Sequence, residues 1–317
     1  MSSHFKVVSL FSGCGGSSLG YQMAGGKVLL AVEWDDNAVE TYRLNFPDTP
    51  IYHGDIAKLS VEECLERIGL QPGELDVLDG SPPCQGFSTA GKREMSDSRN
   101  QLFREYVRLL RGLQPKVFVM ENVSGMVKGK MKLIFAEAMR ELKASGYTVK
   151  CRLMNAMYYS VPQMRKRVIF IGVRNDLKAE VAHPQPQTRP STLREAWTKP
   201  IDHQQMQTCS DLQIKRWAET TKGKAHHARF SLLRLNLDKT PNTILRTPGS
   251  GGHMHPDEPR LCSVGELKRI ASFPDDFVFV GNWYHACERI GNSVPPLFMK
   301  AIAEHIRNNI LSKATLA

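Results

Sequence analysis

One cysteine of this chain stands where a reactive thiol could be presented to a ligand. Cys84 lies in the run Asp79-Gly-Ser-Pro-Pro-Cys-Gln-Gly-Phe-Ser88, directly after a short segment that predicts a strand. Two successive prolines cannot continue a sheet or a helix, so they hold the chain extended where that strand ends. Neighbouring positive charge would activate the thiolate as a nucleophile. Most free cysteines are inert core residues, but this context singles out Cys84 among the seven cysteines.

A carboxylate follows the next predicted strand. Glu121 comes directly after the run Lys116–Met120, which is apolar except at its start. Because parallel strands end at one edge of a sheet, Glu121 should face the same crevice as Cys84. Partial burial there would raise its pKa and suit it to proton transfer. The alternative is a strand-ending acid that caps the next turn.

Two arginines precede a later predicted strand. In the run Gln163-Met-Arg-Lys-Arg167, alternation puts Gln163, Arg165 and Arg167 on one side of the chain. The two guanidinium groups could hold a phosphate or the carbonyl oxygen of a base. A solvated run of charge is the alternative interpretation, and the local sequence favours neither.

A glycine-rich turn near the N-terminus predicts a site for an adenosine-containing cofactor. The run Phe11-Ser-Gly-Cys-Gly-Gly16 joins a predicted strand to a helical stretch, where glycines let the backbone approach a ligand closely. Glu33 could accept hydrogen bonds from ribose hydroxyls, and Trp34 could stack on adenine. Asp55 could bind the adenine amino group or cap the following helix. Because the strict G-x-G-x-x-G pattern fails at Ser18, these residues alone do not separate a nicotinamide cofactor from S-adenosylmethionine.

A sheet must position all of these residues, and the first half of the chain alternates β-rich runs with amphipathic segments. Such alternation predicts an α/β fold whose mostly parallel sheet is covered on both faces. The predicted strands are Lys6–Leu10, Val28–Glu33, Ile51–His53, Asp76–Asp79, Lys116–Met120, Thr148–Met154 and Arg167–Val173. The predicted helices are Asn37–Asn45, Val61–Ile68, Gln101–Leu113, Leu133–Ser145 and, near the C-terminus, Pro296–Asn308.

The alternation stops in the second half of the chain. Residues 183–285 predict a second, smaller and irregular domain, whereas 1–182 and 286–317 should form the first. Between residues 189 and 234, nine Lys or Arg stand against four Asp or Glu, and the whole chain carries a net charge of +10. This charge favours a polyanionic partner, although it is a weak indicator by itself. A basic solvated insertion is the alternative.

Several classes of protein are disfavoured by the sequence. The N-terminus carries no charged-then-apolar leader, and the apolar runs are too short to cross a membrane. The seven cysteines form no Cys-x-x-Cys pair, which argues against a disulfide framework and against a zinc site. We therefore expect a cytoplasmic protein with reduced thiols, no metal and no membrane association.

In the order of its motifs the chain resembles the DNA cytosine-5 methyltransferases of bacterial and phage type, along nearly its whole length. The resemblance implies a Rossmann-like, S-adenosylmethionine-dependent methyltransferase fold with a small target-recognition domain at 183–285. The matching blocks are Phe-Ser-Gly-Cys-Gly-Gly at 11–16, Ser-Pro-Pro-Cys-Gln-Gly-Phe-Ser at 81–88, Glu-Asn-Val at 121–123, Gln-x-Arg-x-Arg at 163–167, the stretch from Arg260 through Phe273-Pro274, and Gly-Asn-Ser-Val-Pro-Pro at 291–296.

The resemblance implies a catalytic set of four residues. Cys84 would be the nucleophile that adds to C6 of a flipped-out cytosine, and Glu121 would contact N3 and the exocyclic amine. Arg167 would contact the base O2, and Arg165 would support the same pocket. Transfer of the methyl group to C5 and elimination of Cys84 would follow without a metal.

The resemblance also implies binding residues. The S-adenosyl-L-methionine site would comprise Phe11, Gly13, Cys14, Gly15, Glu33, Trp34, Asp55, Ile56, Pro83, Leu102, Asn292, Ser293 and Val294. Cys14 stands where the family often has a small or aliphatic residue, a change compatible with cofactor binding. A loop at 86–99 would close over the DNA around the extruded base. The expected nucleic-acid contacts are Gln85, Ser88, Lys92, Gln163, Arg229, Arg234 and Arg246.

We expect the partner to be double-stranded DNA, bound at a short site by a monomer, in the restriction-modification setting of the family. A tRNA cytosine-5 methyltransferase is the nearest alternative, but Gly86-Phe87 and the separate basic region favour DNA. A non-catalytic DNA-binding regulator would have no need of intact Cys84 and Glu121. A nicotinamide oxidoreductase would leave the Pro-Pro-Cys-Gln block unexplained.

Overall fold

The structure is a computed structural model that describes residues 4–83, 98–127, 131–199, 201, 205–227, 229–246 and 252–314. Within these ranges the side chains of 98–100 and 229–231 are not described. Four of the residues predicted to act on the substrate lie outside the described part of the chain: Cys84, Gln85, Ser88 and Lys92.

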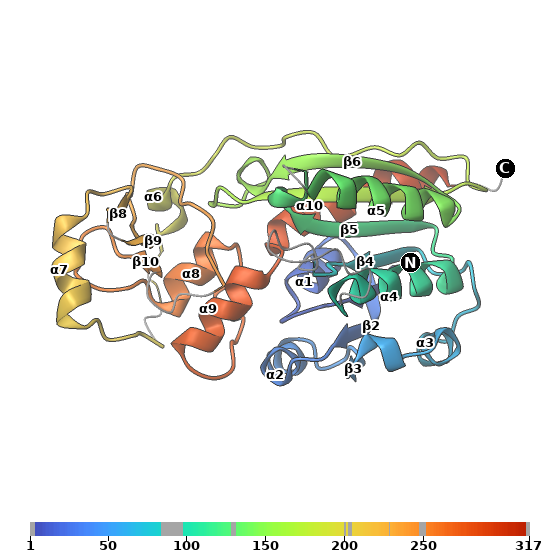
Figure 1. Cartoon of the computed structure of the whole chain (residues 1–317), viewed down its shortest axis with the longest axis horizontal. Coiled ribbons are helices and arrows are strands. Elements are labelled where there is room, and N and C mark those ends of the chain that lie inside the picture. The colour runs from blue at the N-terminus through green and yellow to red at the C-terminus, as the bar shows by residue number, and fades with distance from the viewer. Residues whose placement is uncertain are drawn as a thin grey trace.

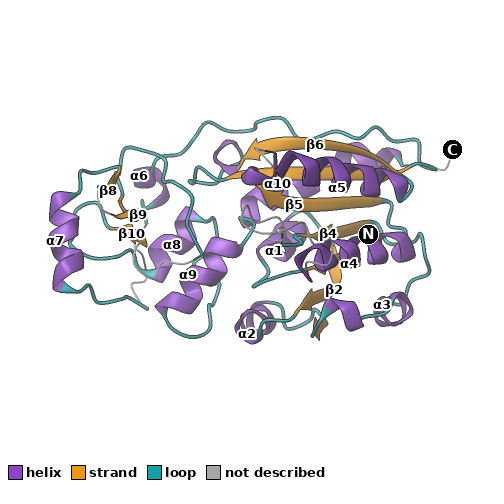
Figure 2. Ribbon diagram, viewed as in Figure 1, coloured by secondary structure: helices purple, strands orange, loops and turns teal. Residues whose placement is uncertain are grey.

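A seven-stranded sheet with the order β3-β2-β1-β4-β5-β7-β6 forms the larger part of the molecule (Figures 1 and 2). Neighbouring strands are parallel except where β7 pairs with β5 and β6, so the predicted α/β fold with a mostly parallel sheet is confirmed. The strands are β1 (Phe5–Leu10), β2 (Gly26–Glu33), β3 (Ile51–His53), β4 (Val77–Gly80), β5 (Val117–Val123), β6 (Tyr147–Asn155) and β7 (Lys166–Arg174).

All seven predicted strands are present, and the largest difference concerns β5. The sequence predicts that this strand ends at Met120, whereas β5 continues to Val123 and therefore contains Glu121. The antiparallel neighbour β7 extends the ladder, because Glu121 pairs with Ile169 and Val123 pairs with Arg167. An acid that follows an apolar run can thus still lie within a strand when its neighbour continues the pairing.

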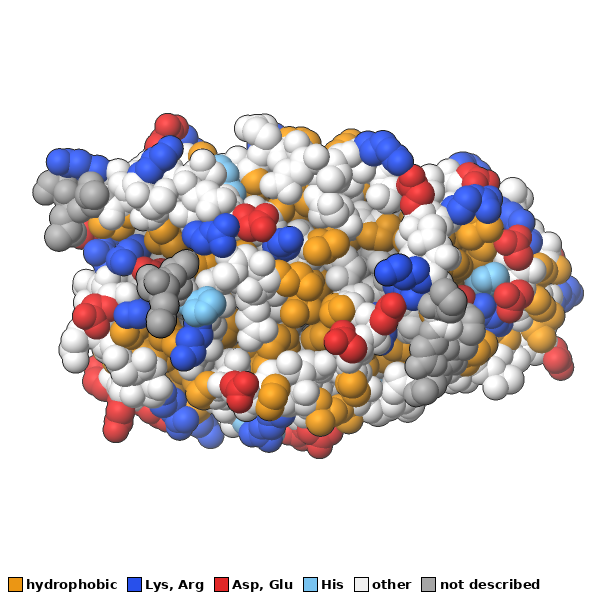
Figure 3. Space-filling view, turned by 180° about the vertical axis from the view of Figure 1, so that it is seen from behind, with side chains coloured by type: hydrophobic (Ala, Val, Ile, Leu, Met, Phe, Trp, Pro, Cys, Tyr) orange, Lys and Arg blue, Asp and Glu red, His pale blue; other side chains and the backbone are white. Residues whose placement is uncertain are grey.

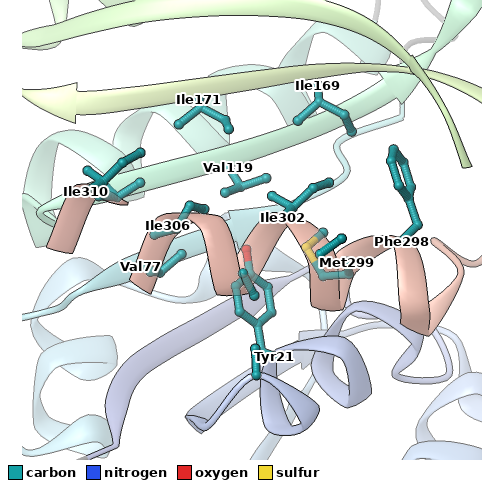
Figure 4. Packing of buried hydrophobic residues seen from close by; sticks show 14 of the residues in the cluster. Tyr21, Val77, Val119, Ile169, Ile171, Phe298, Met299, Ile302, Ile306 and Ile310 are labelled. Atoms are coloured by element: carbon teal, nitrogen blue, oxygen red, sulfur yellow. The ribbon is translucent and has the colours of Figure 1, made fainter. Parts of the chain in front are cut away.

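Helices cover both faces of the sheet. On one face α1 (Gly16–Met23) lies beside α10 (Pro296–His305), which continues as the π-helical turn η5 (Ile306–Ile310), so the end of the described chain returns to the first part of the fold. Figure 4 shows this layer, in which α10 and η5 pack on α1 and on the sheet. The helical residues labelled there are Tyr21, Phe298, Met299, Ile302, Ile306 and Ile310, and the strand residues are Val77, Val119, Ile169 and Ile171. The helices α3 (Val61–Ile68), α4 (Ser98–Leu113) and α5 (Lys132–Ala144) cover the other face.

Residues 183–285 contain short elements that form a separate unit in Figure 1. A three-stranded sheet has the order β10-β9-β8, with β8 and β9 antiparallel and β9 and β10 parallel. Its elements are α6 (Leu193–Ala196), α7 (Asp211–Glu219), β8 (Lys224–His226), β9 (Arg229–Arg234), β10 (Gly252–Met254), α8 (Val264–Ile270) and α9 (Trp283–Asn292). The predicted domain boundary between 285 and 286 therefore falls inside α9.

A third apolar cluster joins this unit to the larger sheet. Phe46, which follows α2 (Asp36–Asn45), packs edge-on against Phe277, with 6.1 Å between the ring centroids. Leu232 of β9 and Ile290 of α9 belong to the same cluster. The small unit is therefore continuous with the core that supports the end of β2.

The surface combines charged and apolar side chains. On the face shown in Figure 3, Lys and Arg are scattered among acidic side chains, and hydrophobic side chains gather across its middle. Within the described ranges, no helix combines the length and the apolar character needed to span a membrane.

Gly20→Ala should destabilise the protein although alanine favours helices. A Cβ at this position of α1 would lie 2.6 Å from Met299 Cβ and 2.7 Å from the Pro296 carbonyl oxygen of α10. The overpacking should cost about 1–3 kcal/mol of unfolding free energy, which exceeds the gain of about 1 kcal/mol in helix propensity. Thermal and urea denaturation measure the difference. Gly125→Ala is the control, because no atom of the described residues lies within 4 Å of the added atom. Equal stability of the two variants would contradict the packing argument.

Candidate functional site

The glycine-rich turn after β1 lies at the switch point between β1 and β4. Gly13 and Gly15 both have positive φ angles, of 55° and 98°. A Cβ on Gly15 would lie 2.2 Å from the Phe46 ring, so the turn can approach α2 only with glycine there. Among the described residues, no atom lies within 4 Å of a Cβ placed on Gly13, which leaves open space beside this backbone in that part of the structure. The predicted strand-glycine-helix arrangement is therefore present and leaves room for a ligand at Gly13.

The carboxylate of Glu33 is oriented by this turn. One of its oxygens accepts a hydrogen bond from the Gly13 N–H at 2.8 Å, and the other accepts from the Trp34 and Asp35 N–H groups at 2.9 and 3.1 Å. Glu33 is 9% exposed, whereas the Trp34 ring beside it is 76% exposed. A fixed carboxylate and an open aromatic face therefore stand together beside the space at Gly13.

Residues from the far end of the sequence complete this edge. The carbonyl oxygen of Val294 would lie 2.4 Å from a Cβ on Gly16, and Cys14 Sγ lies 3.1 Å from Ser293 Oγ. Burial raises the pKa of the Cys14 thiol to about 11, so this side chain is a packing group. The predicted grouping of the turn with the segment after α9 is thus present in the structure.

Four further residues of the predicted cofactor set, Asp55, Ile56, Pro83 and Leu102, differ in their surroundings. Asp55 accepts a hydrogen bond from the Ala57 N–H at 3.0 Å and caps the 3-10 helix η1 (Ile56–Lys58), which is the capping alternative. Ile56 is 4% exposed, and Leu102 packs partly buried against the cluster under α4. Pro83 is exposed.

An ion pair connects the C-terminal end of β5 to the N-terminal end of β7. Arg167 Nε lies 2.6 Å from Glu121 Oε1, and the two side chains are 13% and 10% exposed. Burial from water strengthens such a pair, and the guanidinium fixes the direction of the carboxylate. Glu121 and Arg167 are therefore brought together, as the motif positions predicted.

Asn122 was not among the predicted site residues, but it connects two of their motifs. Its side-chain amide donates to the Pro82 carbonyl at 3.1 Å, and its side-chain oxygen accepts from the Val123 N–H at 2.8 Å. Asn122 is 6% exposed. It thereby connects the end of β5 to the prolines that precede Cys84. The sequence of the Glu-Asn-Val motif does not predict this contact.

Gln163 and Arg165 face the interior, between the two parts of the molecule. Both are 1% exposed, whereas Met164 is 39% exposed, so the predicted alternation is confirmed. The Gln163 amide donates to the Ile270 carbonyl at 3.3 Å and accepts from the Ile244 N–H at 3.2 Å. In this position Gln163 contacts backbone and not the surface where nucleic acid was expected.

The guanidinium of Arg165 likewise forms hydrogen bonds to backbone groups at the junction. It donates to the carbonyl oxygen of Ile244 at 3.4 Å and to that of Gly291, in α9, at 2.8 Å. Burial is the main cause that lowers its pKa to about 9, and the neighbouring Arg167 lowers it further. Arg165 is therefore a positioning group behind Arg167.

The predicted DNA-contacting arginines of the small unit differ in their surroundings. Arg234 stacks on Trp217 with its guanidinium carbon 3.7 Å from the ring centroid, and it donates to the carbonyls of Pro256, Trp217 and Thr220. It therefore holds the unit together, and a stack with a residue 17 positions earlier was not visible in the sequence. Arg246 is exposed, and for Arg229 only the backbone, in β9, is described.

A cleft of about 620 Å³ opens between the sheet and the small unit. Ser124 and Arg167 line it from one side, and β8, β9 and β10 line it from the other. Among the described residues that line it, the Lys and Arg side chains are Lys166, Arg167 and Lys224. The ion pair of Glu121 therefore lies at the wall of a cleft with a basic lining.

Asp79 is a further buried acid at this edge that the sequence analysis did not single out. It is 2% exposed in β4 and accepts hydrogen bonds from Tyr21 Oη and Ser9 Oγ, both at 3.3 Å. Burial raises its pKa to about 7, and the charge of Glu121 contributes to the increase. An acid inside the otherwise apolar run 77–80 was the available signal.

Comparison with known proteins gives consistent similarities. A family model described as C-5 cytosine-specific DNA methylase matches residues 5–233 and 192–308. The type II methyltransferase M1.HphI of Haemophilus parahaemolyticus is 36% identical, over 94% of this chain and 86% of that protein. The type II methyltransferase M.NgoPII of Neisseria gonorrhoeae is 32% identical, over 96% of both.

Two solved structures show the same architecture. A prophage-encoded protein from E. coli, described as a DNA modification methyltransferase, superposes with a TM-score of 0.82 at 27% identity and covers 96% of this chain and 99% of that one. The Dnmt2 methyltransferase of S. pombe superposes with a TM-score of 0.70 at 17% identity, over 96% of this chain and 97% of that one. The second likeness concerns the fold alone.

Asp79→Asn should flatten the pH dependence of stability. Because folding raises the pKa of Asp79 from 3.8 to about 7, the folded state keeps a proton that the unfolded state has released between these values. The free energy of unfolding should therefore fall as the pH rises through this window, and the asparagine variant should lose that fall. Urea denaturation of both proteins between pH 4 and 8 measures the effect; parallel profiles would show that Asp79 does not titrate in this way.

Proposed function

The chain belongs to the C-5 cytosine-specific DNA methylase family, and we propose from this premise that it transfers a methyl group from S-adenosylmethionine to C5 of a cytosine in duplex DNA. The observation that carries the proposal is the 2.6 Å ion pair of Arg167 and Glu121, at the edge where the segment leading to Cys84 begins. A carboxyl group and a guanidinium held side by side match the N3, amine and O2 groups of one cytosine.

Each residue of this set has a distinct role in the proposed reaction. Glu121 shares a proton with N3 and accepts a hydrogen bond from the exocyclic amine, and Arg167 donates to O2, so that electron density is drawn from the ring. The Cys84 thiolate then forms a bond to C6, and the displaced electron pair makes C5 nucleophilic. C5 takes the methyl group, and the sulfonium leaves as the neutral thioether. C5 then gives its proton to water, that electron pair re-forms the C5–C6 double bond, and the C6–S bond breaks with its electron pair returning to sulfur.

The residues at the turn after β1 fit the cofactor that this reaction needs. Bound S-adenosylmethionine supplies an electrophilic methyl group on its sulfonium. The open space at Gly13 would admit the ligand beside the backbone, the fixed carboxylate of Glu33 would accept from the ribose hydroxyls, and the exposed Trp34 ring would stack on adenine. Ser293 and Val294, which contact the turn, would close the site from the C-terminal side.

The cleft supports duplex DNA as the partner. Lys166 and Lys224 stand on opposite walls, one on β7 and one on β8, where they would contact phosphates. The small unit at 183–285 would read the bases, and the cytosine would leave the duplex to reach Glu121. We propose that one chain acts alone on a short site.

Cys84→Ala should reduce methyl transfer at least about a thousandfold while leaving cofactor binding intact, because the thiolate acts only on the base. Transfer of labelled methyl from S-adenosylmethionine to duplex DNA, followed by nucleoside analysis, measures the reaction. Cys151→Ala is the matched control, since Cys151 lies in β6 and burial raises the pKa of its thiol to about 12. Equal loss of cofactor binding and transfer in Cys84→Ala would give Cys84 a structural role instead.

The same assay with tRNA and duplex DNA in parallel distinguishes the candidate substrates. Labelled 5-methylcytosine in DNA, with little label in tRNA, is the expected result. Label in tRNA alone would identify an RNA-modifying enzyme. Tight DNA binding without label in either substrate would identify a non-catalytic regulator.

A further inference from the structure

The helix α2 is held against the small unit by polar side chains. Asn37, Thr41 and Asn45 lie at intervals of four residues, so they share one face of this helix. The Asn45 side chain donates to the Val278 carbonyl at 2.8 Å and accepts from the Val278 N–H at 2.9 Å. The Asn37 side chain donates to the Val280 carbonyl at 3.0 Å, and Thr41 Oγ1 accepts from the Val280 N–H at 3.2 Å. The small unit therefore fixes α2 along its length.

The start of α2 is held by an ion pair as well. Asp35 is the N-cap of this helix, and one of its carboxylate oxygens accepts from the Ala38 N–H at 2.9 Å. Arg289 of α9 donates to both oxygens of the same carboxylate, at 2.8 and 3.2 Å, and is itself buried. A two-point pair of guanidinium and carboxylate fixes the direction of both groups. Arg289 therefore determines where the chain enters α2.

Trp34 lies between two anchored neighbours. The Glu33 carboxylate accepts from the Gly13 N–H at 2.8 Å and from the Asp35 N–H at 3.1 Å, and the Asp35 carboxylate is bound by Arg289. The Trp34 ring is exposed. The backbone on either side, and not packing around the ring, therefore determines where the ring lies.

The backbone of Arg289 reaches the other side of the proposed cofactor site. Its carbonyl oxygen accepts from Ser293 Oγ at 2.6 Å, and Ser293 Oγ lies 3.1 Å from Cys14 Sγ in the glycine-rich turn. The side chain of Arg289 thus holds the turn after β2, and its carbonyl holds the turn after β1 through Ser293. One residue of α9 connects the two turns between which the cofactor would bind.

We propose that Arg289 is a positioning residue for S-adenosylmethionine: through Asp35 it fixes the turn that presents Glu33 and Trp34 to the cofactor. This inference rests on the proposed function. A group that holds binding residues in place acts through geometry, so its loss weakens a site whose contacting side chains are all still present. Because Arg289 acts on the binding turn, its loss should impair cofactor binding more than the methyl-transfer step.

Arg289→Gln and Asp35→Asn remove the pair from either end, and Arg174→Gln is the matched control. Arg174 also forms a two-point pair, with Asp176 at 2.7 and 3.0 Å, but at the edge of the sheet opposite the glycine-rich turn. Equilibrium binding of labelled S-adenosylmethionine is measured for each protein, together with kcat and with the KM values for cofactor and duplex DNA. Because asparagine also caps helices, Asp35→Asn keeps the start of α2 and tests the proposal if Arg289→Gln does not fold.

Arg289→Gln and Asp35→Asn should each weaken cofactor binding about tenfold, and the double variant should bind no more weakly than either one. The KM for the cofactor should rise by a similar factor, whereas kcat and the KM for DNA should change far less. Arg174→Gln should bind the cofactor as the wild-type protein does, even if its thermal stability falls.

A second measurement needs no cofactor. In protein labelled with 5-fluorotryptophan, the ¹⁹F resonance of Trp34 is assigned with Trp34→Phe. This resonance should shift in Arg289→Gln and in Asp35→Asn, whereas the resonances of Trp197 and Trp217, which lie in the small unit, should keep their positions.

Three results would overturn the proposal: cofactor affinity equal to that of the wild type in the folded variants, an equal loss of affinity in Arg174→Gln, or a Trp34 resonance that does not shift. The second result would mean that the pair of Arg289 and Asp35 contributes only stability. Failure of the proposed function is distinct, because the wild-type protein itself would then bind no S-adenosylmethionine or give no 5-methylcytosine in any duplex.

Discussion

Parallel pairing of β1, β2, β4 and β5 requires the residues that follow these strands to meet at one edge of the sheet. The glycine turn after β1, the carboxylate of Glu33 at the end of β2 and the prolines after β4 are separated by tens of residues in sequence, yet they share that edge. The antiparallel strand β7 adds Arg167 from the opposite direction, directly across from Val123. Glu121 and Arg167 can form their ion pair because β5 pairs with the parallel strand β4 on one side and with the antiparallel strand β7 on the other.

The site is also linked to the small unit by buried polar contacts. Gln163 and Arg165 alternate with exposed neighbours, so they enter the junction, whereas Arg167 enters the cleft. From the other direction, Arg289 of α9 forms a bidentate pair with Asp35, at 2.8 and 3.2 Å, beside the predicted cofactor residues. A shift of the small unit would therefore displace side chains at both the proposed base pocket and the proposed cofactor site.

Much of this arrangement could be predicted from the sequence, because local periodicity determines it. The apolar runs gave all seven strands, and alternation gave the side on which Gln163 and Arg165 lie. Alternation does not predict, however, which segment packs on that side. In this structure it is the backbone of Ile244, about 80 residues later in the sequence, that contacts Gln163 and Arg165. Likewise the basic character of Arg234 suggested DNA contact, but its stack on Trp217 depends on tertiary structure.

The junction has one consequence for how such a protein can diversify. Gln163 and Arg165 hold the small unit through the amide and carbonyl groups of Ile244 and the carbonyl of Ile270, and every residue type except proline provides both groups. The small unit can therefore exchange side chains, or a whole loop, without giving up these attachment points, provided that the backbone path through Ile244 is kept. Under the proposed function, the larger sheet could therefore receive a different small unit by recombination without a change in the proposed reacting groups.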